Sequence, residues 1–216
     1  MVKIAASILA GDFRNLEKEV KAVEKAGADW IHLDVMDGHF VDNLTFGPVV
    51  VETVNKITDL PLDVHLMIAN PDKYIERYAQ AGADYLTVHV ETCPDVKKTL
   101  QEIKNNKCKA GLTLKPATLL ETILPYLEQI DLLLIMSVNP GFAGQAFMPE
   151  VLPKLKKVRE YIDKKNLKVE LEVDGGINPQ TAKEVKKNGA TVLVAASAIF
   201  GQKDYGEAIR KLRGIS

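Results

Sequence analysis

Cysteine is scarce in this chain of 216 residues, which contains only Cys93 and Cys108. The two residues form no CxxC pair and belong to no cluster with metal-ligand spacing, so the sequence offers no thiolate metal site. This usage is typical of proteins kept in a reducing compartment. We therefore expect the protein to be cytoplasmic.

Long apolar runs and an excess of charge are also missing. No apolar stretch is long enough to cross a bilayer, and the opening MVKIAASILAGDF lacks the pattern of a cleavable signal. The formal net charge is −1, because acidic residues balance the many lysines. Such balanced runs indicate solvated helix faces. We expect neither a membrane nor a nucleic acid as partner.

No linker rich in Pro, Gly or Ser divides the chain, and 46% of its residues are apolar, enough for one large core. A short unit recurs instead. AGADW at 26–30, AGADY at 81–85 and NGATV at 188–192 each place a glycine between a charged amphipathic run and a β-rich run. Glycine commonly follows the last turn of a helix, so each copy indicates a helix end followed by a strand start.

Strands and helices alternate along the whole sequence. The β-rich runs are KIAASIL, WIHLDV, LDVHLM, YLTVHV, KAGLTL, LLLIMSV, KVELEV and TVLVAA. The expected helices span 15–26, 49–57, 72–81, 95–106, 119–127, 149–165, 179–188 and 205–212. About eight such repeats predict a single α/β domain over residues 1–216, a (β/α)8 TIM barrel. An open doubly wound sheet is the alternative, but ASILAGDF lacks the GxGxxG fingerprint expected after its first strand.

Polar side chains interrupt strands that should be buried. In IHLDVMDG, at residues 31–38, alternation puts His32 and Asp34 on one face, which in a barrel points to the axis. His65 lies near the end of LDVHLM, and Asp174 closes ELEVD. Any one of them could be an ordinary buried polar residue, but two neighbouring buried carboxylates are costly without a cation. We expect these four residues to bind one divalent metal ion, Zn²⁺ first, with Fe²⁺, Mn²⁺ or Co²⁺ as alternatives.

Asp34 and Asp174 are also the expected catalytic residues. Two carboxyl groups on opposite sides of a flat intermediate can remove a proton from carbon and return one to the other face, which inverts a stereocentre. The metal would stabilise the enediolate that forms between. Met36, Met67 and Met136 share the inward faces and are expected to cap the pocket, although methionine also serves as core filler.

The motifs ASILAGDF, HLDVMDGHFV, LTFGP, VHLM, MSVNPGF and VDGGIN, in this order, resemble those of the ribulose-phosphate 3-epimerase family. The resemblance runs over about residues 4–200. It implies a TIM-barrel metalloenzyme of the isomerase class that interconverts D-ribulose 5-phosphate and D-xylulose 5-phosphate in the pentose phosphate pathway. It also implies a homo-oligomer.

Carried over residue by residue, the resemblance makes His32, Asp34, His65 and Asp174 the metal ligands, with both aspartates as acid/base catalysts. It places Ser7 and His65 against the sugar. The phosphate is expected to lie on backbone N–H groups of turns that follow the late strands, a common arrangement in this fold. The residues implied are Gly141, Phe142, Ala143, Gly144, Gly175, Gly176, Ala196 and Ser197.

Ala143 and Ala196 stand where the family usually has glycine, and Asp42 stands where proline is common. An alanine methyl group fits there if the backbone φ is negative. His89 and Glu91 lie on YLTVHVE and are expected behind the pocket.

Three other functions remain open from the sequence. An epimerase for a hexulose phosphate such as D-allulose 6-phosphate would share the metal and both acids. A metal-free decarboxylase or aldolase-like synthase would be expected to carry a lysine at a strand end, and WIHLDV, LDVHLM and KVELEV end without one. A non-catalytic binding barrel is the third alternative.

Overall fold

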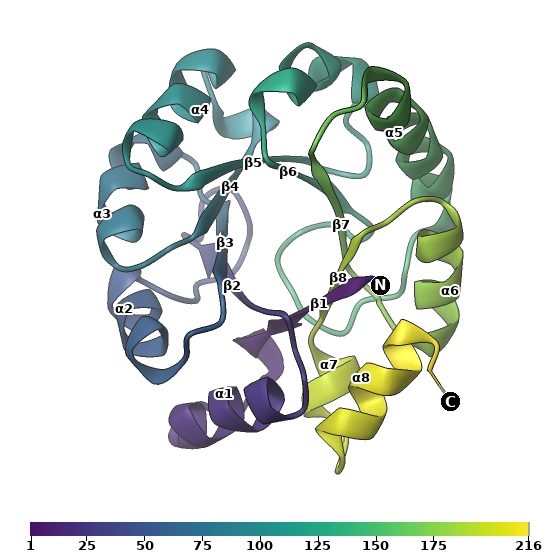
Figure 1. Cartoon of the computed structure of the whole chain (residues 1–216). Helices are drawn as coiled ribbons and strands as arrows, with labels where there is room; N and C mark the ends of the chain where they lie inside the picture. Colours follow the sequence, from purple (N-terminus) through teal and green to yellow (C-terminus); the bar gives the residue numbers. More distant parts are fainter. Residues whose placement is uncertain (216) are drawn as a thin grey trace.

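The computed structural model describes residues 1–215, which form a closed barrel of eight parallel strands enclosed by helices (Figure 1). The strands are β1 (Lys3–Ser7), β2 (Trp30–Met36), β3 (Leu62–Met67), β4 (Tyr85–His89), β5 (Lys109–Leu114), β6 (Leu132–Met136), β7 (Glu170–Asp174) and β8 (Val192–Ala195). They follow one another around the barrel in sequence order, and β8 pairs with β1. The expected (β/α)8 barrel is confirmed and the open sheet was wrong. Of the domain expected over 1–216, Ser216 lies outside the described residues.

Helices cover the outside of the barrel, as the repeated helix–strand pattern predicts. They are α1 (Leu16–Lys25), α2 (Pro48–Ile57), α3 (Ile75–Gln80), α4 (Val96–Asn105), α5 (Leu152–Lys165), α6 (Pro179–Lys187), α7 (Ser197–Phe200) and α8 (Tyr205–Arg213). The helix expected at 119–127 is instead two 3₁₀ turns, Leu120–Thr122 and Leu124–Gln129. Pro125 explains the difference, because proline donates no N–H and breaks a helix interior. The short α7 was not expected.

The two faces of each strand enter different apolar layers. Ile31, Leu33 and Val35 of β2 point outward and pack in the layer between strands and helices. A second apolar cluster fills the inside of the barrel. There Trp30 and Tyr85, the first residues of β2 and β4, pack with ring centroids 4.5 Å apart. This aromatic pair fills the N-terminal end, so the polar inward residues of β2 and β3 lie toward the opposite end.

A polar residue before each even-numbered strand ties that strand to the one before it. The side chain of Asp29 accepts a hydrogen bond from the backbone N–H of Ile4 at 2.7 Å. The same contact recurs for Asp84, Asp131 and Thr191, whose partners are Leu62, Ala110 and Leu171. In three of the four pairs the residue belongs to a copy of the AGAD-type repeat. The repeat therefore sets both the helix end and the strand register.

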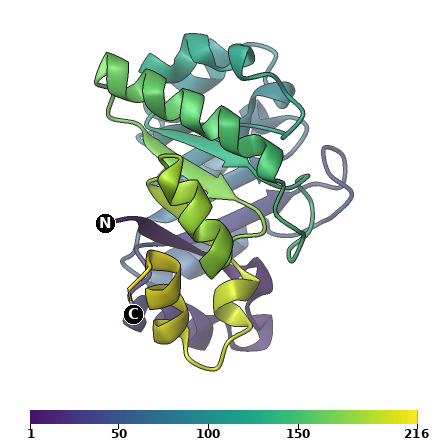
Figure 2. The same ribbon diagram turned by 90° about the vertical axis from the view of Figure 1, so that its right-hand side faces the viewer.

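The loops at the carboxyl ends of the strands gather at one end of the barrel. Figure 2 shows the loops after β2 and β6 projecting from the end opposite the N-terminus. The two loops touch, because the Asn43 side-chain amide donates to the backbone carbonyl of Gly141 at 2.8 Å. Among residues 1–215, no helix has the length and apolar character needed to cross a membrane.

Candidate active site and metal centre

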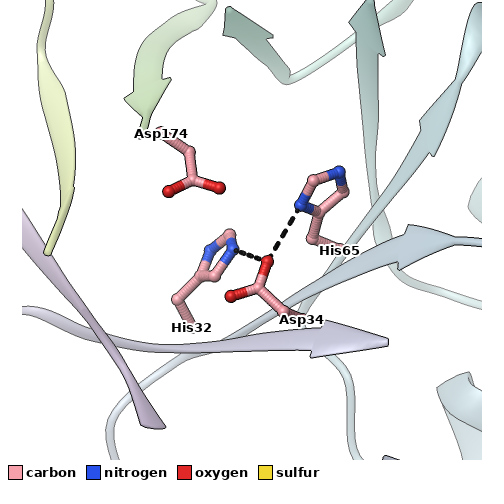
Figure 3. A group of neighbouring side chains, drawn as sticks. All are labelled: His32, Asp34, His65 and Asp174. Atoms are coloured by element: carbon pink, nitrogen blue, oxygen red, sulfur yellow. Dashed lines mark hydrogen bonds and ion pairs between the residues drawn. The ribbon is translucent and has the colours of Figure 1, made fainter. Parts of the chain in front are cut away.

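The four predicted ligands meet at the carboxyl ends of β2, β3 and β7. His32, Asp34, His65 and Asp174 each offer one nitrogen or oxygen atom, and these atoms all lie within 4.8 Å of one another. Strand register brings Asp34 directly beside His65. Asp34 Oδ1 lies 3.2 Å from His32 Nε2 and 3.2 Å from His65 Nδ1. Figure 3 shows Asp174 facing this group from across the barrel.

Short polar contacts hold the two aspartates at their strand ends. Ser7 donates its hydroxyl hydrogen to Asp34 Oδ2 at 2.8 Å, and Thr45 donates to the Asp34 backbone carbonyl at 2.5 Å. Ser137, directly after β6, donates to the backbone carbonyls of both Asp174 and Gly175. Neighbouring strands and loops therefore hold the Asp34 carboxylate and the backbone of both aspartates.

The two carboxyl groups have opposite protonation tendencies. Burial opposes the ionisation of Asp34, but the charge of His32 and hydrogen bonds from both histidines hold its pKa well below the usual value. Burial raises the pKa of Asp174 to about 7, and the negative charge of Asp34 adds to the shift. Without a bound ion, Asp34 is a carboxylate at neutral pH, while Asp174 can carry a proton. A pair of acids separated in this way is what acid–base catalysis requires.

The cluster fits a divalent metal ion. Two imidazole nitrogens and two carboxylate oxygens form a donor set that Zn²⁺ accepts, with metal–ligand distances of about 2.0–2.2 Å. Tetrahedral geometry at such distances separates neighbouring ligand atoms by about 3.3 Å. The two 3.2 Å contacts of Asp34 Oδ1 match that separation. His32 also has the carboxylate–histidine arrangement found behind metal ligands, because its Nδ1 lies 2.6 Å from Asp63 Oδ2.

A pocket opens directly above this cluster. It is open to solvent and is lined by strand ends and by the loops that follow them. Fourteen of the predicted site residues line it: Ser7, Asp34, Met36, Met67, Met136, Gly141, Phe142, Ala143, Gly144, Asp174, Gly175, Gly176, Ala196 and Ser197. His32 and His65 are fully buried and lie outside this lining. A sugar contact by His65 therefore stays a prediction.

Several lining residues were not predicted. Leu9, Val138, Pro140, Gln145 and Val194 also face the pocket. Pro140 and Gln145 flank GFAG, so extending the predicted loop by one residue on each side would have found them. Val194 shares the inward face of β8, pairing in register with Asp174. The alternation of β8 could therefore have indicated it.

Two glycines shape the turn that follows Asp174. Gly175 has φ +120°, and a Cβ atom there would lie 2.5 Å from a methyl carbon of Val138. Gly176 has φ +62°, and its Cβ would lie 2.4 Å from the Phe147 backbone nitrogen. The GG pair is therefore required both by left-handed backbone and by close approach to the loop after β6.

The alanines at the two unusual positions fit the backbone. Ala196 has φ −105°. The non-glycine residues with positive φ in the described chain are Lys107 and Asn166, so Ala143 has no such strain. Neither alanine needs the conformational freedom of the glycine that the family usually carries there.

Further ionisable residues surround the metal ligands. His89 Nε2 lies 2.9 Å from His65 Nε2, and Glu91 Oε2 lies 3.2 Å from His89 Nδ1. The expected position of both residues behind the pocket is therefore correct. Glu172 lies deeper, and both its oxygens lack a hydrogen-bond partner among the described residues. Burial and the charge of Asp63 raise the pKa of Glu172 well above its usual value, which favours the neutral form of this carboxyl group.

Fold and site together define a TIM-barrel protein with a histidine–aspartate cluster that could hold a metal ion, below a pocket at the C-terminal mouth. The sequence model described as "Ribulose-phosphate 3 epimerase family" matches residues 3–200. This chain belongs to the ribulose-phosphate 3-epimerase family.

Individual relatives agree over nearly the whole length. The chain is 54% identical over 215 residues to the ribulose-phosphate 3-epimerase of Bacillus subtilis (strain 168), covering 99% of each protein. It is 49% identical to the ribulose-phosphate 3-epimerase of Synechocystis sp. (strain ATCC 27184 / PCC 6803 / Kazusa), covering 98% of this chain and 93% of that one. The expected family is confirmed, and with it the expected epimerase class.

A solved structure supports the fold independently. A crystal structure of KGPDC from Streptococcus mutans superposes with a TM-score of 0.76, covering 99% of this chain and 96% of that chain. Its sequence identity is 17%, so the likeness concerns the barrel architecture alone.

Proposed function

We propose that this protein is a metal-dependent epimerase that interconverts D-ribulose 5-phosphate and D-xylulose 5-phosphate by proton transfer at C3. The observation that carries the proposal is the pair Asp34 and Asp174, which line one pocket with opposite protonation tendencies. Relatives named ribulose-phosphate 3-epimerase, 49–54% identical, support the choice of substrate.

The two carboxyl groups would act from opposite sides of the sugar. Asp34, ionised at neutral pH, accepts the C3 proton, and the protonated Asp174 delivers its own proton to the other face. In the reverse direction the two exchange roles. Ser7 keeps one oxygen of Asp34 oriented by its hydrogen bond at 2.8 Å. A bound divalent cation would supply stabilisation of the negative charge that develops on the substrate oxygens as the enediolate forms.

Apolar side chains would protect the flat intermediate from water. Met36, Met67 and Met136 line the pocket and are at most 5% exposed. Their thioethers can pack on a planar carbon skeleton without offering a proton. We propose that they cap C3 and its neighbours, and that an early escape of the intermediate is thereby prevented.

The phosphate group would rest on backbone N–H groups. Among the pocket-lining residues of the described chain there is no lysine or arginine. The proposed phosphate contacts are Gly141, Phe142, Ala143, Gly144, Gly175, Gly176, Ala196 and Ser197. The four glycines of this set, Gly141, Gly144, Gly175 and Gly176, all have positive φ. This backbone conformation exposes their N–H groups, as in anion-binding turns. The missing lysine also argues against a lysine-dependent lyase or synthase.

We propose Zn²⁺ as the resident ion, bound by His32, Asp34, His65 and Asp174, because a set of two imidazoles and two carboxylates suits it. Fe²⁺, Mn²⁺ and Co²⁺ are the competing ions. Metal analysis of the purified protein, followed by chelation and reloading with each ion in turn, identifies it. Full epimerase activity in a metal-free preparation would contradict the proposal.

The chemistry is tested by running the reaction in D₂O. Two-acid exchange predicts that deuterium from solvent enters C3 during turnover, which NMR of the product detects. Product that keeps its original hydrogen at C3 would argue against this mechanism. Comparing kcat/KM for D-ribulose 5-phosphate and D-allulose 6-phosphate decides between the pentulose and hexulose substrates. A non-catalytic barrel predicts no turnover of either sugar.

We further propose a cytoplasmic homo-oligomer. Both cysteines are unpaired, which suits a reducing compartment. Leu44 and Val49, 74% and 68% exposed, are candidate contact residues, and most oligomers of soluble proteins are symmetric assemblies of identical chains. Light scattering coupled to size-exclusion chromatography measures the state in solution, and a purely monomeric profile would contradict it.

A further inference from the structure

His65 uses its two ring nitrogens for two different purposes. Nδ1 faces the metal cluster, 3.2 Å from Asp34 Oδ1, as Figure 3 shows. Nε2 lies 2.9 Å from Nε2 of His89, which belongs to β4 and is fully buried. A neutral imidazole carries its proton on one nitrogen only. Whether His65 can bind a metal through Nδ1 therefore depends on where its proton lies.

The contact between the two imidazoles has two possible polarities. In the first, His65 Nε2–H donates to His89, and His65 Nδ1, which donates to Asp34 when no ion is bound, directs its lone pair at a bound cation instead. In the second, His89 Nε2–H donates to His65, whose own proton must then lie on Nδ1. That proton would point at the metal position and block ligation. Only the first polarity gives a metal ligand.

Glu91 selects between these polarities. Its Oε2 lies 3.2 Å from His89 Nδ1, and an ionised carboxylate can only accept a hydrogen bond. In the first polarity His89 Nδ1 carries a proton and donates to Glu91. In the second polarity a nitrogen lone pair would face the carboxylate, which is repulsive. We propose that Glu91, acting through His89, is a positioning residue that fixes the metal-binding tautomer of His65.

The surroundings of Glu91 favour this role. Its other oxygen accepts hydrogen bonds from the Lys115 backbone N–H at 2.7 Å and the Thr118 hydroxyl at 2.5 Å. Burial raises the pKa of Glu91, but the hydrogen bonds from His89, Thr118 and Lys115 outweigh this effect and lower the pKa to about 2. The carboxylate is therefore ionised and held from the loop after β5. Its side chain is 21% exposed and lies outside the substrate pocket.

The arrangement has a counterpart on the other histidine. His32 Nδ1 lies 2.6 Å from Asp63 Oδ2, which holds the ring with Nε2 directed at Asp34. Both predicted histidine ligands thus have a carboxylate behind them, Asp63 in direct contact and Glu91 through a second imidazole. The carboxylates of Asp63 and Glu91 select opposite tautomers of the two rings, because His32 must bind the metal through Nε2 and His65 through Nδ1. This inference rests on the proposed metal site.

The test compares Glu91→Gln with the wild-type protein. Glutamine keeps the shape but can donate to His89 Nδ1, which favours the wrong polarity. We expect the dissociation constant for Co²⁺, measured by chelator competition and visible absorption, to rise about 10–100-fold. Glu121→Gln, an exposed glutamate in the 3₁₀ turn after β5, is the matched control and should stay within twofold.

A second readout follows the tautomer itself. In Zn²⁺-loaded wild-type protein with ¹⁵N-labelled histidine, two-bond ¹H–¹⁵N correlations should place the His65 proton on Nε2, with signals assigned through His65→Asn. A proton on Nδ1 would overturn the inference even if Glu91→Gln failed to fold. A folded Glu91→Gln with wild-type Co²⁺ affinity would overturn it while leaving the proposed function intact. A wild-type protein that binds no metal ion would contradict both this inference and the proposed function.

Discussion

At the scale of single residues, Asp34 and Asp174 show how position alone gives two identical side chains different chemistry. Asp34 lies between two imidazoles and accepts a hydroxyl hydrogen, so its charge is stabilised. Asp174 faces the charge of Asp34 from a partly buried position, which favours retention of its proton. The sequence places both at strand ends, but only their distances decide which one is ionised.

Replacing Asp174 with asparagine should separate stability from catalysis. The pKa of Asp174 is raised to about 7 from 3.8, so folding of the metal-free protein is opposed as pH rises above about 4, increasingly up to about 7. A neutral amide at this position would remove the penalty. Metal-free Asp174→Asn should therefore melt at a higher temperature than metal-free wild type at pH 8, with little difference near pH 4.

The same substitution should lower kcat by at least about 100-fold, because it removes one of the two proton carriers. Thermal melts of chelator-treated proteins at both pH values, together with steady-state assays, measure the two effects. A melting temperature of metal-free Asp174→Asn at pH 8 equal to or below that of the wild type would show that the ionised Asp174 carboxylate does not destabilise the fold.

At the scale of elements, the polar residue before each even-numbered strand ties the barrel into four strand pairs. Asp29, Asp84 and Thr191 stand in the repeated glycine-containing unit, so the sequence indicates three of the four positions. Asp131 stands outside any such repeat, since it follows 3₁₀ turns in place of a helix. Its equivalence to the others becomes visible only once the strands are paired.

Replacing Asp131 with alanine should destabilise the barrel without affecting the site. The backbone N–H of Ala110 would lose its acceptor at 2.8 Å, which costs about 1–3 kcal/mol when the group stays buried. Urea denaturation measures the loss. Glu17→Ala, a change at an exposed residue of α1, is the control and should stay within about 0.5 kcal/mol. Equal stability of the two variants would contradict the role of the aspartate, and KM should be unchanged in both.

At the scale of the whole molecule, one barrel provides both the rigid frame and the metal cluster. The cluster draws its side chains from strands that are distant in sequence, so a bound ion joins β2, β3 and β7. An ion that binds the folded chain and not the unfolded one must stabilise the entire domain.

Metal loading should therefore raise the thermal midpoint. At a free ion concentration of about 100 times the dissociation constant, the gain is about 2.7 kcal/mol. For a chain of this length that corresponds to about 5–11 °C, at about 2–4 °C per kcal/mol. Scanning calorimetry with and without Zn²⁺ measures the shift, and His65→Ala should abolish most of it. An identical midpoint in both wild-type samples would contradict the proposed metal centre.

The sequence by itself determined the barrel, its inward and outward faces, and the four cluster residues. Alternation along a strand and glycine at helix ends are local properties, so they can be read directly from the sequence, as in the motif HLDVMDG. The sequence was less informative at residues 119–127, where Pro125 prevents the predicted helix. The tertiary structure alone decided which carboxyl group keeps its proton, and that Glu91 lies behind His65. Both depend on distances between side chains from different strands, and such distances exist only after the barrel has closed.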